Sequence, residues 1–174
     1  MDYILIDNFF ENVDSIRNTA LSANYTKSNE ETGWKGFRAP IIDVDIISTI
    51  NNKLIEFDSK FKDIILQHFF HYTLDNTKNE QVDFLKERFH KDGFDWAGVV
   101  YLTPNPPPNS GTIIFDRFKN PTIKIENIYN RFVFYNGNTL HGVEDTFGNN
   151  IIDGRMTVTL FGMIDNTKKI KTLI

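Results

Sequence analysis

The sequence contains no cysteine among its 174 residues. Disulfides and thiolate metal sites are therefore excluded, and any metal must be held by His, Asp, Glu or backbone oxygen. A long uninterrupted apolar run is also missing: the start, "MDYILIDNFFENVD", has no basic segment and is broken by Asp7 and Asn8. We expect from this neither a secretion signal nor a membrane span, and hence a cytoplasmic protein with no membrane partner.

An excess of positive charge is missing as well. Lys and Arg number 19 against 23 Asp and Glu, for a net charge of −4. The chain as a whole thus has no attraction to nucleic-acid phosphate, and a nucleic-acid partner is not expected. Aromatics, by contrast, are plentiful at 14%, including 16 Phe. This length and composition predict one globular domain over residues 1–174.

Helical patterns come first along the chain and strand patterns follow. Strand-like "YILIDNFF" opens the sequence, helical spacing covers 11–24 and 46–61, and "TGWKGFRAP" (32–40) is interpreted as a loop. We therefore expect helical support over about 1–63 and an all-β core over about 64–165. The core strands are predicted in "ILQHFFHYTL", "VDFLKERF", "WAGVVYLTP", "GTIIFD", "RFVFYNG" and "RMTVTLFGMI". The proline-rich "TPNPPPNSG" (103–111) is a stiff loop or flap.

The first chemical signal is the stretch "RFHKDGFDWAGVVYL". His90 and Asp92 stand two residues apart, and side chains at i and i+2 of a strand point the same way. An imidazole and a carboxylate are two of the three protein ligands in a ferrous facial triad. The alternative is an ordinary turn, because Asp92 is followed by Gly93.

A triad needs a second imidazole from another strand. His141, in "NGNTLHGVED", follows a predicted strand and opens the next one, so it is the candidate, with a surface loop histidine as the alternative. His68 and His71 are three residues apart and cannot share a strand face. We expect one of them to be packed and the other exposed.

A third signal lies in "GRMTVTLFG". Alternation places Arg155, Thr157, Thr159 and Phe161 on one face of a strand. A buried arginine there would require an anionic partner, whereas an exposed one would pair with Asp153 or Glu144. Tyr101 is positioned to add a phenolic hydrogen bond to the same anion, or else is a core tyrosine.

Together, His-x-Asp, a distal His and Arg-x-Thr resemble the iron(II)/2-oxoglutarate-dependent dioxygenases, over about residues 82–163. The prolyl-hydroxylase-like branch is the most similar, through "VVYLTP", "NSGTIIF" and "RFVFYNGNTLHGV". "WAGVVYLTPNPPP" also resembles stretches of uncharacterised phage and marine bacterial proteins, and a phage-encoded protein would lie in the host cytoplasm. The number of residues between His141 and Arg155 is larger than the number between the distal His and the basic residue in many prolyl-hydroxylase-like enzymes.

This resemblance implies a double-stranded β-helix, a cupin-like jelly-roll barrel with N-terminal helices. It also implies Fe(II) held by His90, Asp92 and His141, and 2-oxoglutarate and O2 as co-substrates, with Arg155, Thr157 and Tyr101 around the 2-oxoglutarate carboxylate. The implied activity is that of a hydroxylase releasing succinate and CO2.

The carboxylate of Asp92 favours hydroxylation over halogenation, because halogenases of this superfamily carry a small residue at that position. The substrate would be a protein side chain such as a prolyl group, or a small metabolite. The alternatives are a cupin-like metal enzyme that does not use 2-oxoglutarate, and a non-catalytic barrel. The loops 32–40 and 103–111 are candidates for a substrate cover.

Overall fold

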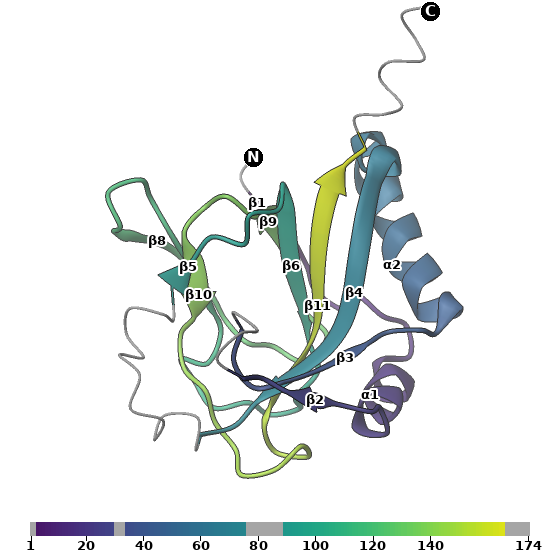
Figure 1. Ribbon diagram of the computed structural model, residues 1–174, viewed down its shortest axis with the longest axis vertical. Helices are drawn as coiled ribbons and strands as arrows, with labels where there is room; N and C mark the ends of the chain where they lie inside the picture. Colours follow the sequence, from purple (N-terminus) through teal and green to yellow (C-terminus); the bar gives the residue numbers. More distant parts are fainter. Residues whose placement is uncertain (1–2, 30–33, 76–88, 166–174) are drawn as a thin grey trace, which may run out of the picture.

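The computed structural model describes residues 3–29, 34–75 and 89–165. It is built from two antiparallel sheets, with two α-helices lying against the larger sheet (Figure 1). The helices are α1 (Val13–Leu21) and α2 (Val44–Phe57), and a 3-10 turn, η1 (Ser59–Asp63), follows α2. Asn12 and Asp43 cap the two α-helices by accepting hydrogen bonds from backbone N–H groups of the first turn.

The larger sheet has seven strands in the order β1-β9-β6-β11-β4-β3-β2. Its strands are β1 (Tyr3–Ile6), β9 (Phe132–Asn136), β6 (Trp96–Tyr101), β11 (Arg155–Ile164), β4 (Ile64–Thr73), β3 (Phe37–Pro40) and β2 (Thr26–Lys27). The long antiparallel pair of β11 and β4 runs through its middle, in register from Arg155 opposite Thr73 to Ile164 opposite Ile64.

The smaller sheet has four strands in the order β5-β10-β7-β8. They are β5 (Phe89–His90), β10 (His141–Val143), β7 (Thr112–Phe115) and β8 (Pro121–Ile125). Figure 1 shows β5, β8 and β10 on the side of the larger sheet that faces away from α2. The two sheets therefore face each other, and the helices cover the outer face of the larger one.

Strand alternation divides the interior into two apolar clusters. The first cluster lies between the helices and the larger sheet. In it, Met156, Val158 and Leu160 of β11 are buried together with Ile46 and Ile50 of α2. Between the two sheets, a second cluster contains Ala97, Val99, Tyr101, Ile114, Ile125, Val133 and Tyr135. Burial on both faces explains why β6 and β9 are almost continuously apolar. The odd-numbered face of β11 is left to line the space between the sheets.

Most predicted elements are confirmed, and a few boundaries are wrong. Residues 37–40 form a strand instead of part of a loop, and β1, β2 and β3 join the larger sheet, so the first 63 residues are more than helical support. The predicted helix 46–61 ends at Phe57, and β8 was not expected. Apart from Phe89, the predicted strand "VDFLKERF" lies outside the described residues. None of the described helices has the length and apolar character needed to cross a membrane.

Candidate metal centre

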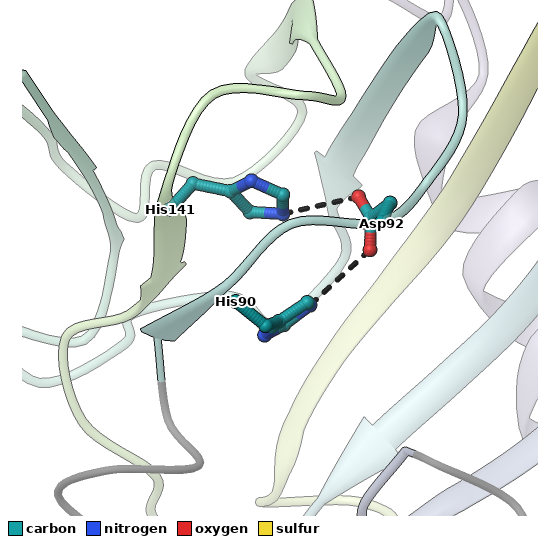
Figure 2. Close-up of side chains that lie close together, drawn as sticks. All are labelled: His90, Asp92 and His141. Carbon is teal, nitrogen blue, oxygen red and sulfur yellow. Dashed lines mark ion pairs between the residues drawn. The ribbon is translucent and has the colours of Figure 1, made fainter. Parts of the chain in front are cut away.

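Three side chains from two neighbouring strands converge on one point between the sheets. His90 is the last residue of β5, Asp92 follows two residues later, and His141 is the first residue of β10. In the antiparallel pair of β5 and β10, His141 is the register partner of His90. Figure 2 shows both imidazole rings directed toward the Asp92 carboxylate. The expected convergence of these three distant side chains is therefore present.

The distances within this cluster are short. Asp92 Oδ1 lies 3.2 Å from His90 Nε2, and Asp92 Oδ2 lies 3.1 Å from His141 Nε2. The two imidazole ring centroids are 4.9 Å apart. One potential ligand atom from each residue lies within 4.8 Å of the others. This spacing brings two nitrogens and a carboxylate oxygen close enough to surround a single ion.

Two contacts with backbone carbonyl groups fix the positions of His141 and Asp92. His141 Nδ1 lies 2.8 Å from the carbonyl oxygen of Thr139. Because a carbonyl only accepts, Nδ1 must carry the proton, and Nε2 is then the atom available to bind a metal. The backbone N–H of Asp92 donates to the carbonyl of Gly137, which ties the His-x-Asp segment to the loop before His141. Both contacts hold the side chains of His141 and Asp92 in place relative to each other.

The charge of Asp92 is the main electrostatic feature here. Burial opposes ionisation of this carboxyl, but the hydrogen bonds from His141 and His90 outweigh it and hold its pKa below the usual range. The carboxylate thus accepts on both oxygens from imidazole Nε2 atoms. The contact between His141 and Asp92 is an ion pair only when that ring carries a second proton, because its first proton is on Nδ1.

A divalent cation would supply the same positive charge and leave both imidazoles neutral. Two imidazoles and one carboxylate on one side of a site are the donor set of non-haem Fe(II) centres. His90 is half exposed, with 52% of its side-chain surface accessible, whereas His141 and Asp92 are 5% and 9% accessible. The donor chemistry of these residues fits Fe(II), and the exposed side of His90 offers an approach from solvent.

The cluster lies in the wall of a cavity of about 780 Å³ between the two sheets. Besides the three cluster residues, polar and aromatic side chains dominate its lining, among them Trp34, Arg38, Phe69, His71, Phe94, Tyr135, Arg155, Thr157, Thr159 and Phe161. This volume is in the range of small-molecule sites. The predicted anion-binding arginine and the predicted metal ligands therefore line one and the same cavity.

The odd-numbered face of β11 lies in this cavity, as the alternation predicted. Arg155 is 3% exposed, and its Nε donates to the carbonyl of Ser110 at 3.0 Å. Within the described residues no carboxylate forms an ion pair with it, so the predicted alternative of an exposed arginine paired with Asp153 or Glu144 is wrong. Burial lowers the pKa of Arg155, and Tyr101 and Tyr135 partly offset this. A buried guanidinium directed at a cavity is suited to an anion that enters from outside.

The hydroxyls near Arg155 come from two strands. Thr157 Oγ1 lies 3.1 Å from Thr159 Oγ1, on the cavity-lining face of β11. Tyr101 is fully buried, its hydroxyl lies 2.7 Å from Thr112 Oγ1, and its ring centroid is 5.4 Å from Arg155 Cζ. Arg155 therefore has Tyr101 as its aromatic neighbour, but the Tyr101 hydroxyl already has a partner in Thr112.

The other two histidines point to opposite faces of β4, as their spacing requires. His68 is buried and lies 3.1 Å from Asn51 Oδ1 on the helix side of the sheet. His71 lines the cavity, and its Nε2 lies 2.6 Å from the carbonyl of Lys35. The expectation of a packed histidine is confirmed for His68, whereas His71 is half-buried and not fully exposed. Neither belongs to the metal-ligand cluster.

Two cavity residues were not identified as site residues from the sequence. Tyr135, on β9, is almost fully buried, and its ring centroid lies 4.7 Å from that of His141 with the two rings tilted by 59°. Arg38 was named only within a possible cover loop, whereas it belongs to β3 and lines the cavity. The alternation of β9 places Tyr135 on the same face as Val133, but only the pairing of β9 with β6 shows that this face is the inner one.

The two candidate cover loops differ in the structure. Trp34, Lys35 and Arg38 of the first loop line the cavity. The proline-rich loop 103–111 contributes no lining side chain, but its Ser110 carbonyl accepts the Arg155 hydrogen bond. The second loop thus supports the arginine from behind.

No protein-family model and no curated protein matches the sequence. The structure, however, is similar to solved structures along almost its whole length. A Pseudomonas putida prolyl-4-hydroxylase aligns with a TM-score of 0.66 at 13% identity, covering 94% of this chain and 92% of that one. A 2OG-Fe(II) oxygenase family oxidoreductase from Burkholderia pseudomallei gives 0.66 at 9% identity, covering 93% and 85%.

A third similar structure is a prolyl hydroxylase from Trichoplax adhaerens in complex with a peptide fragment of the hypoxia inducible factor oxygen degradation domain. It gives a TM-score of 0.61 at 13% identity, covering 97% of this chain and 86% of that one. Identities this low establish the fold alone. The chain therefore has the jelly-roll, double-stranded β-helix fold found in 2OG-Fe(II) oxygenases and prolyl hydroxylases.

Proposed function

We propose that this protein is an Fe(II)- and 2-oxoglutarate-dependent dioxygenase that hydroxylates a C–H bond and releases succinate and CO2. The observation that carries the proposal is the placement of two imidazoles, a carboxylate and a buried guanidinium around one cavity, the guanidinium having no carboxylate partner among the described residues. A metal enzyme that does not use 2-oxoglutarate would have no need of Arg155, and a non-catalytic barrel would have no need of any of the four groups.

In this proposal, His90 Nε2, His141 Nε2 and an Asp92 oxygen hold the iron. The bound iron, with 2-oxoglutarate and O2, supplies the oxidising power for the reaction. Asp92 provides the negative charge that a divalent cation needs, and its low pKa keeps it ionised throughout the neutral range. The Thr139 carbonyl keeps the His141 proton on Nδ1, so that Nε2 remains a ligand. A carboxylate at position 92 supports hydroxylation over halogenation.

Arg155 would anchor the far carboxylate of 2-oxoglutarate. Its Nε is occupied by Ser110, which leaves the two terminal nitrogens for a bidentate contact. Thr157 lies on the same face, and Tyr101 lies beside the guanidinium. Rotation of the Tyr101 hydroxyl away from Thr112 would add a further donor to the bound carboxylate. Aromatic side chains around the cavity would keep water from the reacting groups.

The substrate in this proposal is a prolyl-like side chain of a protein or a small metabolite. The likeness to a prolyl hydroxylase that was crystallised with a peptide supports the first class. The aromatic side chains that line the cavity support the second.

The proposal is tested by anaerobic titration of the protein with Fe(II) and then 2-oxoglutarate. A weak visible charge-transfer band at one equivalent of each, followed by succinate release on admission of air, is the expected result. Fe(II) binding without a band or succinate would favour the metal enzyme that does not use 2-oxoglutarate. Absence of Fe(II) binding would favour the non-catalytic barrel.

A further inference from the structure

Arg38 is a second arginine in the cavity, and neither the metal nor 2-oxoglutarate accounts for it. It lies on β3, in register with His71 of β4, and lines the same cavity as the three cluster residues. Its guanidinium carbon is 4.6 Å from the ring centroid of Trp34 and 5.2 Å from those of Phe69 and Phe161. The group is thus held in a box of three aromatic rings.

The aromatic box leaves the hydrogen-bonding capacity of Arg38 unused. Its Nε is buried and has no hydrogen-bond partner, and no carboxylate of the described residues is within ion-pair distance. Ring faces attract the flat side of a guanidinium, but the N–H groups point outward in its plane and require acceptors there. Burial lowers the pKa of Arg38 to about 10, with Asp92 acting in the opposite direction, so it remains charged at neutral pH.

The charge of the cavity lining also favours an anionic ligand. Among the described residues that line it, Lys35, Arg38, Lys91 and Arg155 are cationic, and Asp92 is the only carboxylate, which leaves three positive charges in excess. Fe(II) and the dianion of 2-oxoglutarate cancel each other and leave that excess unchanged. The chain as a whole is acidic, at −4, so the local positive charge is opposite to its overall balance.

We propose that Arg38 binds a carboxylate group of the primary substrate, and that this substrate is a free carboxylic acid or amino acid with an apolar or aromatic body. The carboxylate fills the in-plane hydrogen bonds of the guanidinium, and the body packs against Trp34, Phe69 and Phe161. This proposal rests on the proposed function and selects its small-molecule alternative over a protein side chain. It makes Arg38 a specificity residue distinct from Arg155.

The test compares acids with their own primary amides, which have the same shape and no charge. Phenylacetate, indole-3-acetate and L-phenylalanine are each titrated against their amides by calorimetry, into the protein with Fe(II) and 2-oxoglutarate under argon. At least one acid is expected to bind more tightly than its amide. Arg38→Gln is expected to weaken that acid by roughly 10- to 100-fold and to leave the amide unchanged.

Two further variants make the result specific. Arg117→Gln removes an exposed cation outside the cavity and is expected to keep the preference for the acid. Arg38→Lys keeps the charge but lacks the bidentate fork, and it is expected to show an intermediate loss should Arg38→Gln fail to fold. The 2-oxoglutarate titration of both Arg38 variants is expected to match the parent protein.

The proposal is overturned if none of the acids binds, if acids bind no better than amides, or if the preference survives in Arg38→Gln. It is also overturned if Arg38→Gln loses 2-oxoglutarate as Arg155→Gln does, because Arg38 would then anchor the co-substrate. Failure of the proposed function has a different signature: the charge-transfer band is absent from the parent protein, while calorimetry still reports the comparison of acid with amide.

Discussion

His90 and His141 face each other across the antiparallel pair of β5 and β10, as register partners with ring centroids 4.9 Å apart. One strand pairing therefore sets the separation of the two imidazoles, although 50 residues lie between them in the sequence. Asp92 enters from just beyond the end of β5 and bridges them with its two oxygens. The geometry of the candidate metal centre thus depends on the pairing of β5 with β10 in the smaller sheet.

Removal of one imidazole should abolish tight metal binding. His141→Ala is expected to lower Fe(II) affinity by more than the roughly 10- to 100-fold that changes in outer-shell partners cost. Anaerobic Fe(II) titration provides the measurement. His68→Ala is the matched control, since His68 is a buried histidine on the opposite face of β4, bonded to Asn51. Equal Fe(II) binding by parent and His141→Ala would remove His141 from the centre.

Arg155 should set the requirement for 2-oxoglutarate. Truncating one partner of a buried charge pair typically costs about 2–5 kcal/mol, so Arg155→Ala and Arg155→Gln are expected to raise the 2-oxoglutarate concentration needed by roughly 30-fold or more. Fe(II) binding should persist in both. Arg117→Gln serves as the control, because Arg117 is an exposed arginine outside the cavity. Loss of activity with an unchanged 2-oxoglutarate dependence would reject the assignment.

Tyr101 should matter for the same co-substrate, but less. Its hydroxyl already has Thr112 as a partner at 2.7 Å, so Tyr101→Phe removes one neutral hydrogen bond and is expected to weaken 2-oxoglutarate binding by about 1 kcal/mol, roughly fivefold. The same titration of the charge-transfer band measures this. An effect as large as that of Arg155→Gln would mean that the hydroxyl, and not the guanidinium, is the main anchor.

His71 should make the fold sensitive to acid. Burial, together with the nearby Arg38, lowers its pKa to about 3 despite the hydrogen bond to the Lys35 carbonyl, whereas an unfolded histidine titrates near 6.5. Between these values the unfolded chain binds the extra proton. The free energy of unfolding therefore falls as pH falls from about 6.5 toward 3, by at most about 1.4 kcal/mol per pH unit for this one proton.

The variant that isolates this effect is His71→Gln, whose amide can still donate to the Lys35 carbonyl. Urea unfolding of both proteins with EDTA at pH 7 and pH 5 gives the comparison. The parent is expected to lose more stability than the variant over this interval, since all other titrating groups are shared. Identical losses would show that His71 does not titrate in this range.

The sequence was sufficient where the chemistry repeats with the period of a strand. Arg155, Thr157 and Thr159, on alternate positions of β11, line the cavity as predicted because alternation decides which face a side chain occupies. His90 and Asp92 do converge, although Asp92 lies beyond the end of β5 and strand alternation does not place it. The buried strands β6 and β9 were found because they are almost continuously apolar. Local pattern alone thus located the candidate ligands and the cavity face of β11.

What the sequence left out depends on contacts between distant strands. Residues 37–40 follow a glycine and end in a proline, so their sequence resembles that of a loop. They form a strand because they pair with β4. Tyr135 and Arg38 could not be assigned to the cavity because that depends on which strands lie next to β9 and β3. The strand β8 of the smaller sheet was not predicted either, because its first residue is a proline and its residues are mostly exposed.

The central claim is that His90, Asp92 and His141 hold one ferrous ion, and anomalous diffraction from crystals grown anaerobically with Fe(II) tests it most directly. The expected result is a single iron peak within bonding distance of His90 Nε2, His141 Nε2 and an Asp92 oxygen. Iron bound at other residues, or an iron-free cavity in which the His141 ring points away from Asp92, would contradict it.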